Sequence, residues 1–226
     1  MQNFNQLVLF THIAAGFTAL IVGAVPIIAE KGGLIHRRAG LIFFYAMLIL
    51  SVAALWLVAF KGANIFLGFI GVFSFYNAYS GKRILTFKST ESKPILLDYL
   101  MLISLTINGL YMLYMVLRNI VAASTDWSMV ILYGIFGLFC LAMAREDWLF
   151  FRSMKLSKYG KMHWFFTHMT RMMGAYIATW TAFIVVNYSN MGLPEQFGVL
   201  AWILPGVIGG FFISRSVKHF ALKKRV

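Results

Sequence analysis

Apolar residues fill seven long stretches of the chain, and short polar segments separate them. A helix needs roughly 20 residues to cross a bilayer, and each stretch is near that length. The pattern predicts an all-α protein, a polytopic membrane helix bundle with seven transmembrane helices over about residues 7–29, 39–60, 63–80, 95–117, 129–144, 163–186 and 197–214. The third and fifth stretches are short, so six spans with one re-entrant segment are the alternative. No loop is long enough to separate domains, and we expect one transmembrane domain over residues 1–226.

Lysine and arginine are distributed unevenly among the connections. Only Lys61 and Arg118 lie in one set of alternate connections, and Arg171 lies inside the sixth stretch. Basic residues in short loops are retained on the cytoplasmic side of a membrane. An N-terminus outside and a C-terminus in the cytoplasm place the other basic residues on that side: Lys31, Arg37, Arg38, Lys82, Arg83, Lys88, Lys93, Arg145, Arg152, Lys155, Lys158, Lys161, Arg215, Lys218, Lys223, Lys224 and Arg225.

Composition excludes a soluble or disordered chain. Hydrophobic residues make up 61% of the sequence and charged residues 12%, whereas soluble domains are about half apolar and a quarter charged. The net charge of +13 comes from loops between apolar blocks, so we expect the lipid bilayer and not nucleic acid as a partner. The chain lacks the alternation of membrane strands, which favours a bacterial inner (plasma) membrane. The one cysteine, Cys140, excludes an internal disulfide and cysteine-based zinc sites.

Arg171 is the most informative residue, because it lies about eight residues into the sixth stretch. A charge at that depth costs several kcal/mol unless it meets a partner or water. His168 lies three residues earlier and shares a helix face with Arg171. A structural ion pair or snorkelling is one interpretation, and a cation that binds a ligand is the other. The carboxylates expected on the same inner half are Glu30, Asp98, Glu146 and Asp147.

Three histidines lie near the expected cytoplasmic surface: His36, His163 and His168. Together with carboxylates they could form a metal site, although the sequence contains neither HxxxH nor HExxH. His163 is rotated by about 140° from His168 on a helix, so the two would not chelate one ion from that helix. A haem between two imidazoles needs matching depth on facing helices, which favours His36 with His163. Hydrogen bonds to headgroups or helix ends are the structural alternative.

Two segments resemble a family of bacterial multi-pass membrane proteins classed as a domain of unknown function. One is KGGxxHRRxG, from Lys31 to Gly40, and the other is HxxRMxGxYIA, from His168 to Ala178. The resemblance covers the first, second and sixth stretches well and the middle of the chain loosely. It implies a multi-pass membrane protein and no established activity.

These residues lead to a functional hypothesis that is not enzymatic. A cytoplasm-facing pocket would bind or transport a small anionic or lipid-like ligand through Arg171 and His168, and Asp147 or Glu146 would balance the arginine when the pocket is empty. The alternative is a membrane-embedded metal- or haem-dependent oxidoreductase, or another metalloenzyme, that uses the inner-side histidines. A structural subunit of a larger complex is a third interpretation, and the sequence does not reveal the oligomeric state.

Overall fold

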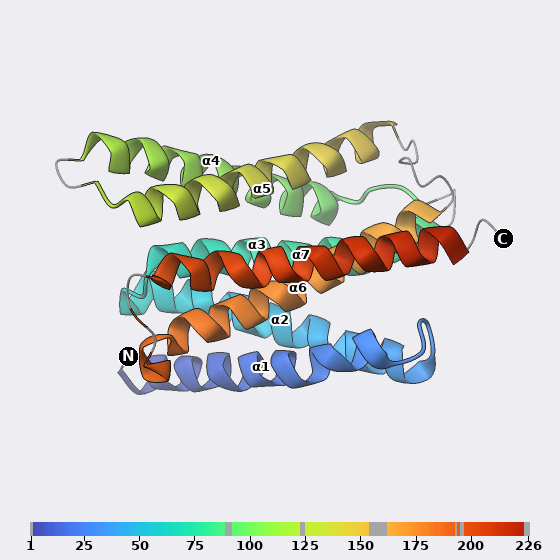
Figure 1. The fold of residues 1–226 in the computed structure, drawn as a ribbon, viewed down its shortest axis with the longest axis horizontal. Helices are drawn as coiled ribbons and strands as arrows, with labels where there is room; N and C mark the ends of the chain where they lie inside the picture. Colours follow the sequence, from blue (N-terminus) through green and yellow to red (C-terminus); the bar gives the residue numbers. More distant parts are fainter. Residues whose placement is uncertain are drawn as a thin grey trace. The chain divides into compact units, whose positions relative to one another are not determined.

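The protein is built from helices (Figure 1). The structure, a computed structural model, describes residues 2–88, 92–122, 125–153, 162–192, 194 and 197–223. No strand occurs in these residues, which confirms the prediction of an all-α protein. Two short 3-10 helices, η1 (Ile84–Lys88) and η3 (Ser189–Met191), accompany the α-helices. The α-helices are α1 (Gln2–Ile28), α2 (Leu34–Lys61), α3 (Ile65–Arg83), α4 (Leu96–Val121), α5 (Trp127–Ser153), α6 (His163–Asn187) and α7 (Gly198–Lys223).

Several helices are longer than the apolar stretches that predicted them. The fifth was expected to end near residue 144, but α5 continues to Ser153 and includes Glu146 and Asp147. Charged residues end a membrane-buried stretch without ending a helix, because Arg and Glu are good helix formers. The second helix begins at Leu34, just after the Gly33 cap, and not near residue 39.

Six of the seven α-helices among the described residues are long and apolar enough to cross a membrane, which supports a multi-pass membrane protein. The exception is α3, which has 19 residues and carries Ser74, Asn77 and Ser80 in addition to two basic residues at its end. The count of seven spans is therefore not confirmed. The fifth stretch, which looked short in the sequence, belongs to a 27-residue helix that qualifies as a span.

The chain forms two compact units, which we describe separately. Unit 1 comprises Met1–Lys82 and Phe166–Val226, and unit 2 comprises Arg83–Phe165. Unit 1 therefore contains α1, α2, α3 up to Lys82, most of α6, and α7, whereas unit 2 contains Arg83 at the end of α3, η1, α4, α5 and the first turn of α6. The expectation of one domain over residues 1–226 stays a prediction.

Successive helices of unit 1 run in opposite directions (Figure 1). The α1–α2 turn, the end of α3, the start of α6 and the end of α7 consequently lie at the same end of the unit. Gly32 makes the tight turn between α1 and α2 with φ +80°, a conformation that other residues rarely adopt. Small residues let these helices pack closely, in a core formed by Ala19, Phe43, Phe44, Ala46, Met47, Ala78 and Ala175.

Gly23 allows a close approach between α1 and the aromatic rings of α2 and α6. A Cβ atom on Gly23 would lie 2.6 Å from Cδ2 of Tyr176 and 2.9 Å from Cδ2 of Phe43. The Tyr176 hydroxyl also donates a hydrogen bond of 3.0 Å to the Leu20 carbonyl on α1, which holds the ring against this helix.

Gly23→Ala is expected to lower the thermal unfolding midpoint of the detergent-solubilised protein. The added methyl group would force the Tyr176 and Phe43 rings to move, and overpacking of this kind costs about 1–3 kcal/mol. Gly40→Ala is the matched control, because a Cβ at Gly40 has nothing within 4 Å. Equal midpoints for Gly23→Ala and the wild type would contradict this packing.

In unit 2, glycines bring α4 and α5 together. A Cβ on Gly109 of α4 would lie 2.9 Å from Cβ of Cys140, and one on Gly137 of α5 would lie 3.2 Å from the Gly109 carbonyl oxygen. The buried Asn108 amide donates to Cys140 Sγ across the same interface at 3.5 Å. Helix association in lipid relies on this combination of small residues and interhelical hydrogen bonds.

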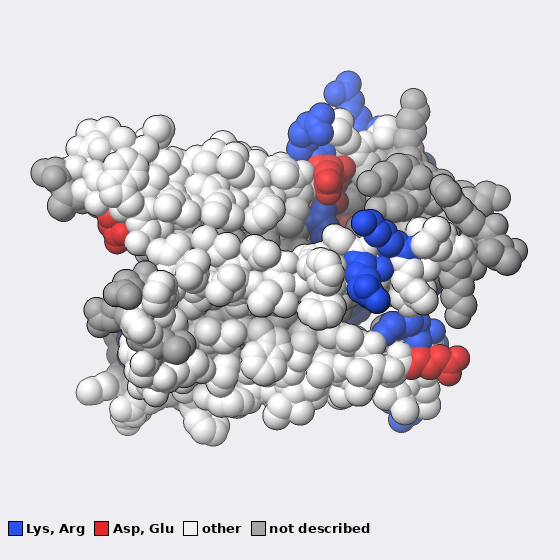
Figure 2. All heavy atoms as spheres, viewed as in Figure 1, with Lys and Arg blue, Asp and Glu red and all other residues white. Residues whose placement is uncertain are grey.

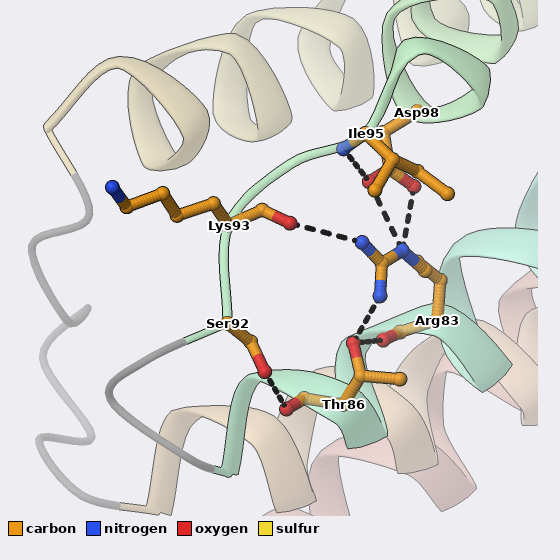
Figure 3. A network of polar contacts seen from close by, with 6 residues as sticks. All are labelled: Arg83, Thr86, Ser92, Lys93, Ile95 and Asp98. Atoms are coloured by element: carbon orange, nitrogen blue, oxygen red, sulfur yellow. Dashed lines mark hydrogen bonds and ion pairs between the residues drawn. The ribbon is translucent and has the colours of Figure 1, made fainter.

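A buried ion pair links the end of α3 to the start of α4 (Figure 3). Arg83 Nε donates to both carboxylate oxygens of Asp98, at 2.8 and 3.0 Å, and the Asp98 side chain is fully buried. The other two guanidinium nitrogens donate to Thr86 Oγ1 and, at 3.1 Å, to the Lys93 carbonyl. Asp98 Oδ2 also accepts the Ile95 N–H at 2.8 Å and so caps α4. One arginine thus binds the start of α4 and two residues of the segment that connects the helices, Thr86 and Lys93.

Asp98→Asn is expected to destabilise the protein by about 3 kcal/mol, because removing one partner of a buried pair leaves the other charge uncompensated. The thermal unfolding midpoint in detergent reports the loss. Asp126→Asn is the matched control: Asp126 is exposed and accepts the Ser128 and Met129 N–H groups at the start of α5. Asparagine caps a helix as well as aspartate does, so this control should stay near the wild type. Similar shifts in the two variants would refute the special role of the pair.

Candidate functional site

His168 lies on α6 and contacts the end of α3 in unit 1. Its Nδ1 is 2.7 Å from the Gly81 carbonyl oxygen. Gly81 is one of the last four residues of α3, whose carbonyls have no partner within their own helix. A carbonyl can only accept, so the proton must lie on Nδ1 of His168. The absence of a side chain at Gly81 permits the approach, because a Cβ there would lie 3.0 Å from Cβ of Arg171.

His36, in the first turn of α2, makes the same kind of contact with the end of α1. Its Nδ1 is 3.1 Å from the Pro26 carbonyl oxygen, again an acceptor among the last four residues of a helix. Lys31 Nζ also donates to this oxygen, at 2.8 Å, and to the Ile27 carbonyl. Burial lowers the pKa of Lys31 from its ordinary value. Because the Pro26 carbonyl oxygen can only accept a hydrogen bond, the proton of His36 also lies on Nδ1.

The two imidazoles are neighbours, with ring centres 6.2 Å apart and planes tilted by 60°. Four helices hold them: α2 and α6 carry the rings, while α1 and α3 supply the carbonyls that orient them. Because both Nδ1 atoms donate to backbone, Nε2 carries the lone pair in each neutral ring. Metal-ligating histidines are commonly oriented by such a second hydrogen bond.

Arg171 lies one helical turn after His168 and is only 6% exposed. Its guanidinium carbon is 6.0 Å from the ring centre of Tyr76, a fully buried residue of α3. This distance is the outer limit for a cation–π contact. The arginine is thus held within unit 1, next to the helix that carries Gly81.

Charge in unit 1 is strongly positive at the end that holds the α1–α2 turn. Figure 2 shows a group of basic side chains gathered at this end. We call this region the basic end, defined by Lys31, Arg37, Arg38, Lys82, Arg215 and Lys218. Among the described residues of unit 1, Glu30 is the only Asp or Glu. Other residues that supported the predicted orientation lie outside the described residues, namely Lys155, Lys158, Lys161, Lys224 and Arg225.

The remaining predicted site residues belong to unit 2. His163 opens α6, with its ring centre 4.9 Å from that of Phe150. Glu146 and Asp147 lie on α5, and their role as counter-charges to Arg171 stays a prediction. Asp98, another expected counter-charge, pairs with Arg83. Within the part of the chain that the structure describes, no group of three or more His, Cys, Asp or Glu side chains could hold a metal ion.

Comparisons with protein-family models, with curated proteins and with solved structures gave no match for this chain. The resemblance of the KGGxxHRRxG and HxxRMxGxYIA segments to a family of uncharacterised bacterial membrane proteins therefore stays a prediction.

The structure brings together two of the three histidines of the expected metal set, since the ring of His36 lies next to that of His168. The match in depth between His36 and His163 stays a prediction. The sequence analysis missed Gly81; the signal for it was a glycine directly before Lys82 and Arg83, at the end of an apolar stretch.

Proposed function

We propose that this protein binds or transports a small anionic or lipid-like ligand through a pocket at the basic end of unit 1. The observation that carries the proposal is the burial of Arg171, a cation within α6, which is long and apolar enough to cross a membrane. An arginine fork matches a carboxylate or phosphate with two parallel hydrogen bonds. Ionisable residues within membrane spans commonly mark ligand or ion pathways.

His168 and His36 form the second part of the proposed pocket. His168 precedes Arg171 by three residues, or about 4.5 Å along the helix, so a ligand on the guanidinium also comes within reach of the imidazole. The hydrogen bonds to Gly81 and Pro26 fix both rings before a ligand arrives. A site that is already ordered loses less entropy when it binds.

The proposal includes seven spans in a bacterial inner membrane, with the N-terminus outside and the C-terminus in the cytoplasm. Support comes from the basic end, because lysine and arginine in short loops stay on the cytoplasmic side. Lys61 is the only described basic residue at the other end of unit 1. With this orientation the pocket opens to the cytoplasm.

The orientation predicts which of two added cysteines reacts in intact cells. Gln2→Cys should be labelled by a membrane-impermeant maleimide, and Lys218→Cys only after permeabilisation, since both positions are exposed. The native Cys140 is buried and should give little background. Labelling of both cysteines in intact cells, or of neither, would show an even number of spans. The reverse pattern would invert the orientation.

Arg171→Gln is expected to weaken anion binding by about 10- to 100-fold, because hydrogen bonds to charged groups contribute about 1.5–3 kcal/mol. The probe is inorganic phosphate, titrated against the thermal unfolding midpoint of the protein in a neutral detergent. A second titration adds phosphatidylglycerol or phosphatidylcholine to the same micelles and follows the same unfolding midpoint. It distinguishes binding of a free anion from binding of a lipid headgroup.

Lys61→Gln is the matched control, because it removes the same charge from unit 1 at the other end of α2. It should leave phosphate and phosphatidylglycerol binding unchanged. If Arg171→Gln does not fold, Arg171→Lys keeps the charge but loses the fork, and a loss of binding of about tenfold is still expected. Unchanged binding in the folded Arg171 variant would refute the proposed pocket.

A further inference from the structure

We propose that His36 and His168 bind one divalent first-row transition metal ion, and that the anionic ligand completes its coordination beside Arg171. This inference rests on the proposed function, since it names what lies between the imidazoles and the anion. Imidazole suits zinc, copper, iron and nickel. The site differs from the three-histidine set expected from the sequence, because it uses two histidines of unit 1 and leaves out His163.

The first argument is the proton position on each ring. Nδ1 of His36 and Nδ1 of His168 both donate to backbone carbonyls. A neutral ring held in this way offers only the lone pair of Nε2 to a ligand. A lone pair repels the oxygen of a carboxylate or phosphate but binds a metal cation. An anion in this pocket therefore needs an electrophile between itself and the imidazoles.

The second argument is the separation of the rings. With metal–nitrogen bonds of about 2.0–2.1 Å and about 1.2 Å from a ring nitrogen to the ring centre, two imidazoles on one ion have centres about 5.2–6.6 Å apart. The lower value corresponds to a tetrahedral angle and the upper value to ligands on opposite sides of the ion. The observed 6.2 Å lies within this range.

The third argument is charge. A divalent cation alone would be unfavourable in a unit that has an excess of lysine and arginine, but a bound anion offsets that charge. Two protein ligands leave coordination positions open, as in metal sites that accept an exogenous ligand. Arg171 is on the same helix face as His168, so one oxyanion could coordinate the metal through one oxygen and the guanidinium through another.

The test begins with metal content. The protein is purified without a polyhistidine tag, treated with chelator, equilibrated with Zn²⁺ and separated from free metal by gel filtration. Mass spectrometry should find about one zinc per chain in the wild type and about tenfold less in His36→Asn and His168→Asn. Asparagine can still donate to the Pro26 or Gly81 carbonyl, so these variants keep the helix contacts. His36→Gln and His168→Gln replace them if they do not fold.

Two other histidines supply matched controls. Nδ1 of His12 also lies 3.0 Å from a backbone carbonyl oxygen, that of Leu50, and His163 belonged to the metal set expected from the sequence. His12→Asn and His163→Asn should both retain zinc. Zinc-free wild type, or equal zinc in His36→Asn, His168→Asn and the wild type, would overturn the inference.

A second measurement separates this inference from the proposed function. Phosphate binding should strengthen at least about tenfold when zinc is bound, and Arg171→Gln should keep the zinc while losing the phosphate. The alternative is a proton in place of the metal as the electrophile. In that case phosphate binding to chelator-treated protein would depend on Arg171 and would strengthen from about pH 8 to about pH 6. That result would overturn the metal and leave the proposed function intact. If the two histidines bind zinc but no anion binding depends on Arg171, the proposed function is refuted instead.

Discussion

Backbone groups in a bilayer must find their hydrogen-bond partners within the protein, and the last turn of every helix leaves carbonyls without them. In unit 1 this constraint is met by side chains from neighbouring helices. His36 donates to the end of α1, and His168 donates to the end of α3. The same two bonds fix the ring protons, the ring orientations and the neighbouring positions of the imidazoles. The candidate site is therefore a result of how two helices end.

The sequence predicted the helices well because apolar length is a strong signal for a membrane helix. It located their ends less well, since hydropathy shows where a helix leaves the apolar layer and not where it stops. Glu146 and Asp147 ended the apolar stretch, yet α5 continues beyond them for six residues, to Ser153. The end of α3 was harder to foresee, because it depends on the pairing of Arg83 with Asp98 across a connection with little apolar pattern.

For the site, the sequence predicted which residues lie on one helix face and that inner-side histidines gather, but not which atoms of neighbouring helices meet. Arg171 stands out because a charge in a span is costly, and His168 follows from the three-residue spacing. The approach of His36 to His168 depends on the antiparallel packing of α2, α3 and α6, which hydropathy does not encode. Gly81 has no chemistry of its own. Its importance lies in a carbonyl and a missing side chain, and neither is visible without the neighbouring helix.

The polarity of α3 has a consequence for how this helix is held in unit 1. This helix is outside the set that is apolar enough to span a bilayer alone, yet Ser51 of α2 donates to its Gly71 carbonyl, and its Ala78 belongs to the core of unit 1. A segment of this kind partitions into lipid more favourably when a neighbour already shields its polar groups. The place of α3 in unit 1 therefore depends on its contacts with neighbouring helices and not on its own hydropathy.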